Sequence, residues 1–142
     1  MAYSIVCYAS MKRITILLAD DHKIVRKGIR MLLEHEADIE VVGEAKNGRQ
    51  AVQLAGKLHP TVVVMDIAMP LLNGLEATRQ ILKALPATKV LMLSAHSDDA
   101  YVERAKESGA VGYLVKQSSN GILAQAIRAV TKRKMFFRPA IA

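Results

Sequence analysis

The chain has 142 residues, of which 51% are hydrophobic and 23% charged, a composition that indicates one globular domain and excludes a disordered chain. Its net charge is +7, but residues 119–142 carry five basic side chains and no acid, so the other 15 basic and 13 acidic residues leave only +2. This distribution argues against a nucleic-acid-binding surface over the whole domain. Because the single cysteine, Cys7, allows no internal disulfide and no signal peptide or membrane span is evident, we expect a cytoplasmic protein.

Five short apolar runs alternate with helical patterns along the chain. Several runs are rich in β-branched residues and some are apolar without alternation, which is typical of strands buried on both faces. Between them, apolar residues recur every three or four positions, as in helices packed on one face. We therefore predict strands over 14–19, 40–44, 62–66, 90–95 and 112–115, with helical stripes within 24–33, 51–58, 75–82, 101–105 and 122–130.

Three residues mark expected helix ends. Asn47 and Ser97 precede helical patterns and have side chains that accept hydrogen bonds from free N–H groups, so both are predicted N-caps. Gly109 follows a helical pattern and is a predicted terminator, because glycine tolerates the left-handed conformation found there.

The alternation of strands and helices predicts an α/β fold. The expected architecture is a doubly wound, five-stranded parallel sheet of the flavodoxin-like (βα)5 type, with helices on both faces. In such sheets a ligand site lies at the carboxyl ends of the strands.

Polar residues stand where these predicted strands end. They are Asp20 and Asp21 after the first strand, Asp66 after the third, Ser94 near the end of the fourth, and Lys116 after the fifth. Although far apart in the sequence, these side chains are expected to meet at one edge of the sheet.

This set of side chains suits phosphoryl transfer. Three carboxylates in one cleft repel each other, and Mg²⁺, which prefers oxygen ligands, would relieve that cost. A carboxylate can act as a nucleophile toward a phosphoryl group, and transfer then needs mainly positioning and charge neutralisation. The pattern therefore predicts that Asp66 is phosphorylated beside a magnesium ion held by Asp20, Asp21 and Asp66.

Over roughly 13–132 the chain resembles the receiver domains of two-component response regulators. The motifs that carry the resemblance are, in chain order, LLADDH, VVVMDIAMPLLNG, VLMLSAH and GAVGYLVK. Each motif is weak alone, but the set in this order and spacing is specific.

The resemblance implies roles for the acidic residues. Asp66 is then the phosphoacceptor and a magnesium ligand. Asp21 binds Mg²⁺ directly, Asp20 binds it largely through water, and the backbone carbonyl of Ala68 is a further ligand.

The resemblance also implies contacts to the phosphoryl group and a switch. Ser94 and Lys116 contact the phosphoryl oxygens, and Ser94 and Tyr113 form the conformational switch, with Tyr113 rotating inward on phosphorylation. The expected activity is a self-catalysed transfer with slow autodephosphorylation, which is signalling rather than enzymatic turnover.

Two further stretches, VVGEAKNGRQAV and FFRPAIA, resemble the subgroup that carries a C-terminal LuxR-type helix-turn-helix domain. We therefore expect an N-terminal extension over 1–10, a receiver domain over 11–134, and over 135–142 the start of a linker to a DNA-binding domain absent from this chain. The implied partners are a sensor histidine kinase, DNA through that absent domain, and a homodimer formed on phosphorylation. No membrane partner is expected.

Three other functions fit the residues less well. A phosphatase resembling haloacid dehalogenases would carry a second aspartate two residues after the first, where this chain has Ala68. A dinucleotide-binding sheet would need a glycine-rich loop after its first strand, where this chain has ADDHK. Direct DNA binding would need a base-reading helix or a continuous basic face.

The histidines give a weaker signal. His22, His35 and His59 are expected on surfaces or loops, because no metal-ligand spacing connects them. For His96 two interpretations stay open: it lies at the rim of the site, or it is a solvated loop residue.

Overall fold

The computed structural model describes residues 13–116 and 121–137. The predicted extension over 1–10 and the end of the expected linker, including Arg138 and Pro139, lie outside the described residues.

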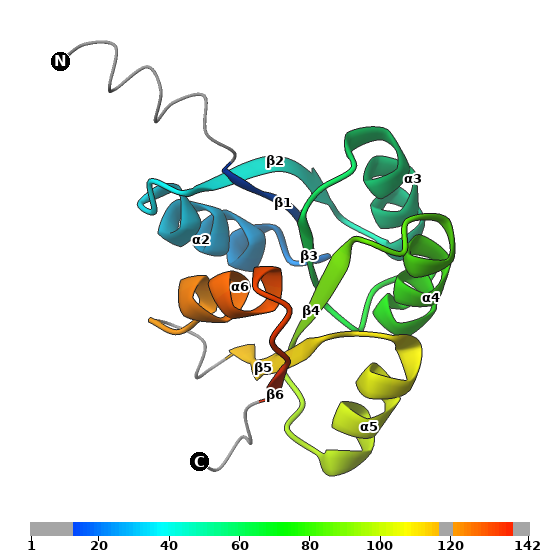
Figure 1. Ribbon diagram of the computed structural model, residues 1–142. Helices are drawn as coiled ribbons and strands as arrows, with labels where there is room; N and C mark the ends of the chain where they lie inside the picture. The colour runs from blue at the N-terminus through cyan, green and yellow to red at the C-terminus, as the bar shows by residue number, and fades with distance from the viewer. Residues whose placement is uncertain (1–12, 117–120, 138–142) are drawn as a thin grey trace, which may run out of the picture.

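Within the described residues the chain forms a six-stranded parallel sheet with helices on both faces (Figure 1). The strands are β1 (Ile14–Ala19), β2 (Ile39–Ala45), β3 (Val62–Met65), β4 (Lys89–Ser94), β5 (Gly112–Val115) and β6 (Phe136–Phe137). The helices are α2 (Lys23–Glu34), α3 (Gly48–Leu58), α4 (Gly74–Ala84), α5 (Asp99–Ser108) and α6 (Leu123–Thr131). The spatial order is β2-β1-β3-β4-β5-β6, and the five predicted strands are confirmed to within one residue at either end.

The predicted α/β fold with a parallel sheet is confirmed, and the sheet has one short strand more than the five that the sequence predicted. The Phe136 N–H donates to the Val111 carbonyl at 2.8 Å, and Phe136 and Phe137 pair with Gly112 and Tyr113 of β5. A Cβ on Gly112 would lie 2.8 Å from the Phe136 carbonyl oxygen, so the glycine lets the two backbones approach. Two residues are too few to show a strand period, and the sequence therefore gave no sign of this strand.

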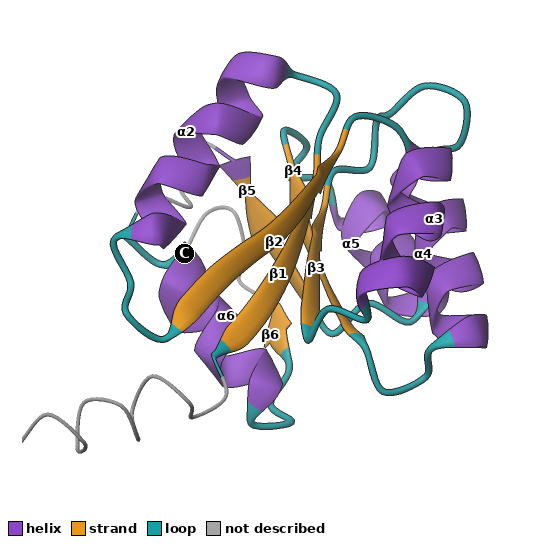
Figure 2. Ribbon diagram, turned by 90° about the horizontal axis from the view of Figure 1, so that it is seen from above, coloured by secondary structure: helices purple, strands orange, loops and turns teal. Residues whose placement is uncertain are grey.

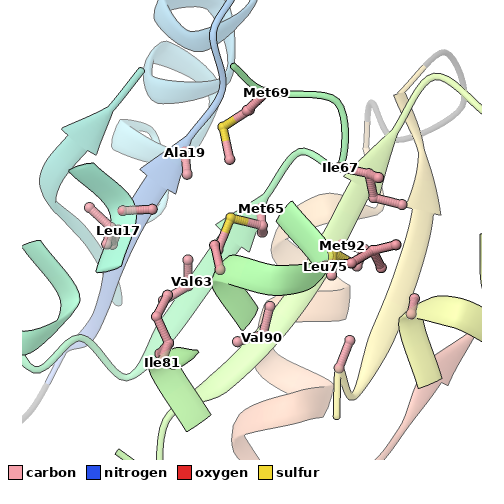
Figure 3. Packing of buried hydrophobic residues seen from close by; sticks show 14 of the residues in the cluster. Leu17, Ala19, Val63, Met65, Ile67, Met69, Leu75, Ile81, Val90 and Met92 are labelled. Carbon is pink, nitrogen blue, oxygen red and sulfur yellow. The ribbon is translucent and has the colours of Figure 1, made fainter. Parts of the chain in front are cut away.

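The helices form two layers. Figures 1 and 2 show α2 and α6 on one face of the sheet and α3, α4 and α5 on the other. Side chains of each central strand alternate between these layers, because successive residues of a strand point to opposite faces. The face of the sheet covered by α3, α4 and α5 carries Leu17, Val63, Met65, Val90 and Met92 (Figure 3). The face covered by α2 and α6 carries Ile16, Leu18, Val62, Val64 and Leu91. Both faces are buried, which explains the unbroken apolar runs in the sequence.

The expected helix ends are partly confirmed. The Asn47 side chain accepts a hydrogen bond from the Gln50 N–H at 2.8 Å, and Gly109 ends α5 in the left-handed conformation with φ 102°. The predicted N-cap Ser97 is wrong, because the residue that precedes α5 is Asp98, without a side-chain capping bond. Whether serine or aspartate takes that position depends on where the loop turns, which the local sequence leaves open.

The apolar stripe of α2 is wider than the surface it buries. Ile29 and Leu33 are buried against the sheet, but Ile24 is 86% exposed and Leu32 is 46% exposed.

Among the described residues, no helix has both the length and the apolar character needed to cross a membrane.

Two glycines in α3 and α4 allow a test of backbone packing. A Cβ on Gly74 would lie 2.0 Å from the Asp66 carbonyl oxygen, whereas one on Gly56 would meet nothing within 4 Å. We expect Gly74→Ala to lower the free energy of unfolding by about 1–3 kcal/mol or more, because the loop after β3 must move. Gly56→Ala is the matched control and should raise it by roughly 0.5–1 kcal/mol. Urea denaturation of both variants measures this, and equal stability in the two would contradict the close contact.

Candidate functional site

The site lies where the strand order reverses. The chain leaves β1 for β2 on one side, and β3 returns to the other side of β1, so a crevice opens at the carboxyl ends of β1 and β3. Ala19 pairs with Met65 in register, and the Asp66 N–H donates to the Ala19 carbonyl at 2.9 Å. The residues that follow these strands, Asp20 and Asp66, are therefore placed side by side.

Asp20 is held on several sides. Its side chain is only 2% exposed, and its N–H donates to the Ala45 carbonyl at 3.0 Å. One carboxylate oxygen, Oδ1, accepts from the His22 N–H at 2.8 Å. The other, Oδ2, lies 2.8 Å from the Lys116 Nζ. The carboxylate thus has a fixed orientation at the end of β1.

Asp66 shares the same lysine. Asp66 is 4% exposed, and Lys116 Nζ donates to its Oδ2 at 3.2 Å. Burial raises the pKa of the Asp66 carboxyl, Lys116 opposes this, and Asp20 and Asp21 add to the rise. Burial alone would lower the pKa of Lys116, but the hydrogen bond to Asp20 and the attraction of Asp66 outweigh it and raise the pKa. The ammonium therefore stays charged between two buried acids.

The acidic residues form a cluster with the geometry of a cation site. Ligand atoms of Asp20, Asp21, His22 and Asp66 all lie within 4.8 Å of one another. Three of the four offer carboxylate oxygens, the donors that Mg²⁺ prefers, so the residues present fit this ion. Ala68, the other expected ligand residue, lies exposed on the loop two residues after Asp66.

His22 also belongs to this cluster, although no pattern in the sequence predicted a role for it there. It is 64% exposed, as expected of a surface residue, but its Nδ1 lies 3.2 Å from Asp20 Oδ1 and 3.1 Å from Asp21 Oδ1. Its position directly after the two aspartates was the one signal available.

Ser94 and Tyr113 meet at the backbone of His96. The Ser94 hydroxyl accepts from the His96 N–H at 3.1 Å, and the Tyr113 hydroxyl donates to the His96 carbonyl at 2.7 Å. Tyr113 is 1% exposed, so its ring already occupies the inward position expected after phosphorylation. Burial is the main cause that raises the pKa of Tyr113. The His96 ring stacks on Tyr101 with centroids 4.4 Å apart, beside the expected switch.

Sequence reasoning missed Arg26, which contacts the site, and Glu44, which contacts Arg26. Arg26 of α2 donates to the Asp20 carbonyl at 2.7 Å and to the Glu44 carboxylate of β2 at 2.7 Å. Because these partners lie six and eighteen residues away, no local pattern pointed to them.

Comparison with known proteins agrees with this geometry. Residues 16–128 match the family model described as the response regulator receiver domain. The transcriptional regulatory protein LiaR of Bacillus subtilis is 44% identical over 84% of this chain and 56% of its own length. DegU of Brevibacillus brevis is 39% identical over 91% of this chain and 55% of its own length. The chain thus spans a little over half the length of these relatives.

A solved structure agrees as well. A two-component response regulator of the LuxR family from Aurantimonas sp. SI85-9A1 superposes with a TM-score of 0.87 at 38% identity, covering 92% of this chain and 93% of that chain. By its family match and its relatives, this chain belongs to the receiver-domain family of two-component response regulators, of the LuxR type.

Proposed function

We propose that this chain is the phosphoacceptor module of a transcriptional response regulator in the cytoplasm. Asp66 accepts a phosphoryl group from the phosphohistidine of a sensor histidine kinase and later loses it to water. The observation that carries the proposal is the position of Lys116, whose ammonium lies within 3.2 Å of carboxylates on both Asp20 and Asp66. The Lys116 ammonium, the proposed nucleophile Asp66 and the carboxylate oxygens proposed to bind the metal therefore lie next to one another.

The chain's own residues have defined parts in the transfer. An oxygen of the Asp66 carboxylate attacks phosphorus, the bond from phosphorus to the kinase imidazole nitrogen breaks, and its electron pair returns to that nitrogen. Lys116 supplies positive charge to the phosphoryl oxygens, and the Ser94 hydroxyl donates to one of them. Mg²⁺, bound by Asp20, Asp21, Asp66 and the Ala68 carbonyl, would neutralise further charge on those oxygens. Hydrolysis of the acyl phosphate by water restores the Asp66 carboxylate and releases phosphate.

The route to an output domain leads through β5 and β6. Tyr113 pairs with Phe137 across these strands, and Lys106 of α5 lies over the Phe137 ring at 5.0 Å. We propose that phosphorylation shifts a population between two packings of Ser94 and Tyr113. We propose that this shift is passed to the segment after β6, the proposed linker to a LuxR-type DNA-binding domain. By a second proposed route, the same shift favours a homodimer.

The nucleophile can be tested directly. With Mg²⁺ and acetyl phosphate, the protein should gain one phosphoryl group that is stable in acid and labile to base and hydroxylamine. Asp66→Asn should abolish the label, because an amide does not attack phosphorus. The matched control Asp98→Asn removes an exposed acid near the same edge and should label normally. Intact-protein mass spectrometry reads the result, and equal labelling of Asp66→Asn would reject Asp66 as the acceptor.

The metal ligands can be ranked. We expect Asp21→Asn to raise the Kd for Mg²⁺ by about tenfold or more, and by more than Asp20→Asn does. Asp21 is the more exposed of the two, whereas Asp20 is already occupied by Lys116 and the His22 N–H. Calorimetric titration of each variant measures the Kd, and EDTA should abolish labelling of the wild type. Unchanged affinity in Asp21→Asn would count against this pocket.

The switch can be tested with beryllofluoride, a stable mimic of the phosphoryl group. Ser94→Ala should still bind it, but the amide chemical shifts of Tyr113 and Phe137 should respond less than in the wild type. Ser94→Thr keeps the hydroxyl and is the control expected to respond. If Ser94→Ala responds as fully as the wild type, the coupling does not pass through Ser94.

A further inference from the structure

Helix α2 directs one half-buried arginine, Arg26, back toward the loop that precedes the helix. Arg26 is 14% exposed, and its Nη1–H donates to the Asp20 carbonyl at 2.7 Å. Its main-chain N–H donates to the His22 carbonyl at 2.9 Å, as part of the first helical turn. Both the backbone and the side chain of Arg26 therefore hold carbonyl groups of the loop that carries the acidic cluster.

The other end of the guanidinium is anchored on the sheet. Arg26 Nε–H donates to Glu44 Oε1 at 2.7 Å, and Arg30 Nη1 donates to Glu44 Oε2 at 2.5 Å. Burial would raise the pKa of the Glu44 carboxyl, but the hydrogen bonds from Arg30 and Arg26 outweigh it and lower the pKa. Glu44 is thus an ionised, doubly bonded anchor at the end of β2.

The bond to the Asp20 carbonyl acts on both acids at once. The Asp20 carbonyl and the Asp21 N–H belong to one planar peptide unit, so fixing that carbonyl fixes the direction in which the chain enters Asp21. The Asp20 side chain is fixed separately by Lys116 and the His22 N–H. The Asp21 side chain is 30% exposed, and among the ion pairs of the described residues its partner is the exposed His22 ring. The direction of the Asp21 side chain therefore depends more on its backbone.

We propose that Arg26 is a positioning residue of the acidic site: by joining Glu44 to the Asp20 carbonyl, it sets the Asp20–Asp21 peptide so that both carboxylates face Asp66 before a cation binds. This inference rests on the proposed role of the cluster as a magnesium site, but not on phosphoryl transfer. Groups that orient metal ligands from behind commonly contribute much of a site's affinity.

A positioning role and a purely electrostatic role of Arg26 predict opposite changes in magnesium affinity when its side chain is replaced. A positive charge near a cation site repels the cation, so electrostatics alone predicts that its loss tightens magnesium binding. Loss of a positioning contact predicts weaker binding, because the loop must then be ordered when the ion binds. The sign of the change therefore separates the two effects.

Arg30 provides a matched control. Arg26→Gln and Arg30→Gln each remove one positive charge and one hydrogen bond to Glu44, but only Arg26 contacts the Asp20 carbonyl. We expect Arg26→Gln to raise the Kd for Mg²⁺ by about tenfold, the lower end of the range for groups behind metal ligands. Arg30→Gln should leave the Kd close to that of the wild type.

The experiment is a magnesium titration of the whole chain, followed by the amide shift of Asp21 at constant ionic strength. Thermal unfolding without metal measures any general loss of stability in each variant. Arg26→Lys should bind with intermediate affinity, because an ammonium can donate to the carbonyl or to Glu44 but lacks the planar fork. Because Arg26→Lys keeps the positive charge, binding weaker than in the wild type cannot come from a change of charge, so this variant gives a second test if Arg26→Gln does not fold.

Unchanged or tighter binding in Arg26→Gln, or equal weakening in Arg30→Gln, would overturn the positioning role while leaving the proposed function intact. A wild-type protein that binds no magnesium would contradict the proposed metal site itself, and this inference with it. Intermediate affinity in Arg26→Lys and little change in Arg30→Gln would support it.

Discussion

The site depends on the burial of two carboxylates at neighbouring strand ends and on the lysine that compensates them. Asp20 and Asp66 are 2% and 4% exposed, and a buried ionised carboxylate without a partner is costly. Lys116 bridges one oxygen of each. The arrangement therefore requires that β1, β3 and β5 end side by side at one edge of the sheet. Phosphorylation or metal binding would act on the same charged groups that stabilise the arrangement.

The parallel sheet supplies that alignment. The register of β1 with β3 sets Asp20 beside Asp66, and β5 delivers Lys116 from across β4. The close approach of α4 to the loop after β3, at Gly74, fixes the loop that carries Asp66 and Ala68. Close packing of the backbone at Gly74 therefore helps to set the position of Asp66.

The β5–β6 edge of the sheet connects the site to the C-terminal part of the chain. Tyr113 lies on β5 between the His96 backbone, which also bonds Ser94, and Phe137 of β6. A change in the packing of Tyr113 would act on both neighbours, because its buried ring has little free space around it. This gives the proposed switch a short physical path to whatever follows β6.

Five of the six strands, their parallel arrangement and the residues at their carboxyl ends could be predicted from the sequence, because burial on both faces and the order of elements leave few alternatives. The sequence also identified Asn47 and Gly109 as helix ends, since capping depends on a few neighbouring residues. The contacts between particular atoms could not be predicted in this way. The short β6 strand, the His22 ring at the aspartates, and the Arg26 bridge to Glu44 depend on helix rotation and strand register. Contacts between residues far apart in the chain arise only when the elements pack, so no local pattern of residues could have shown them.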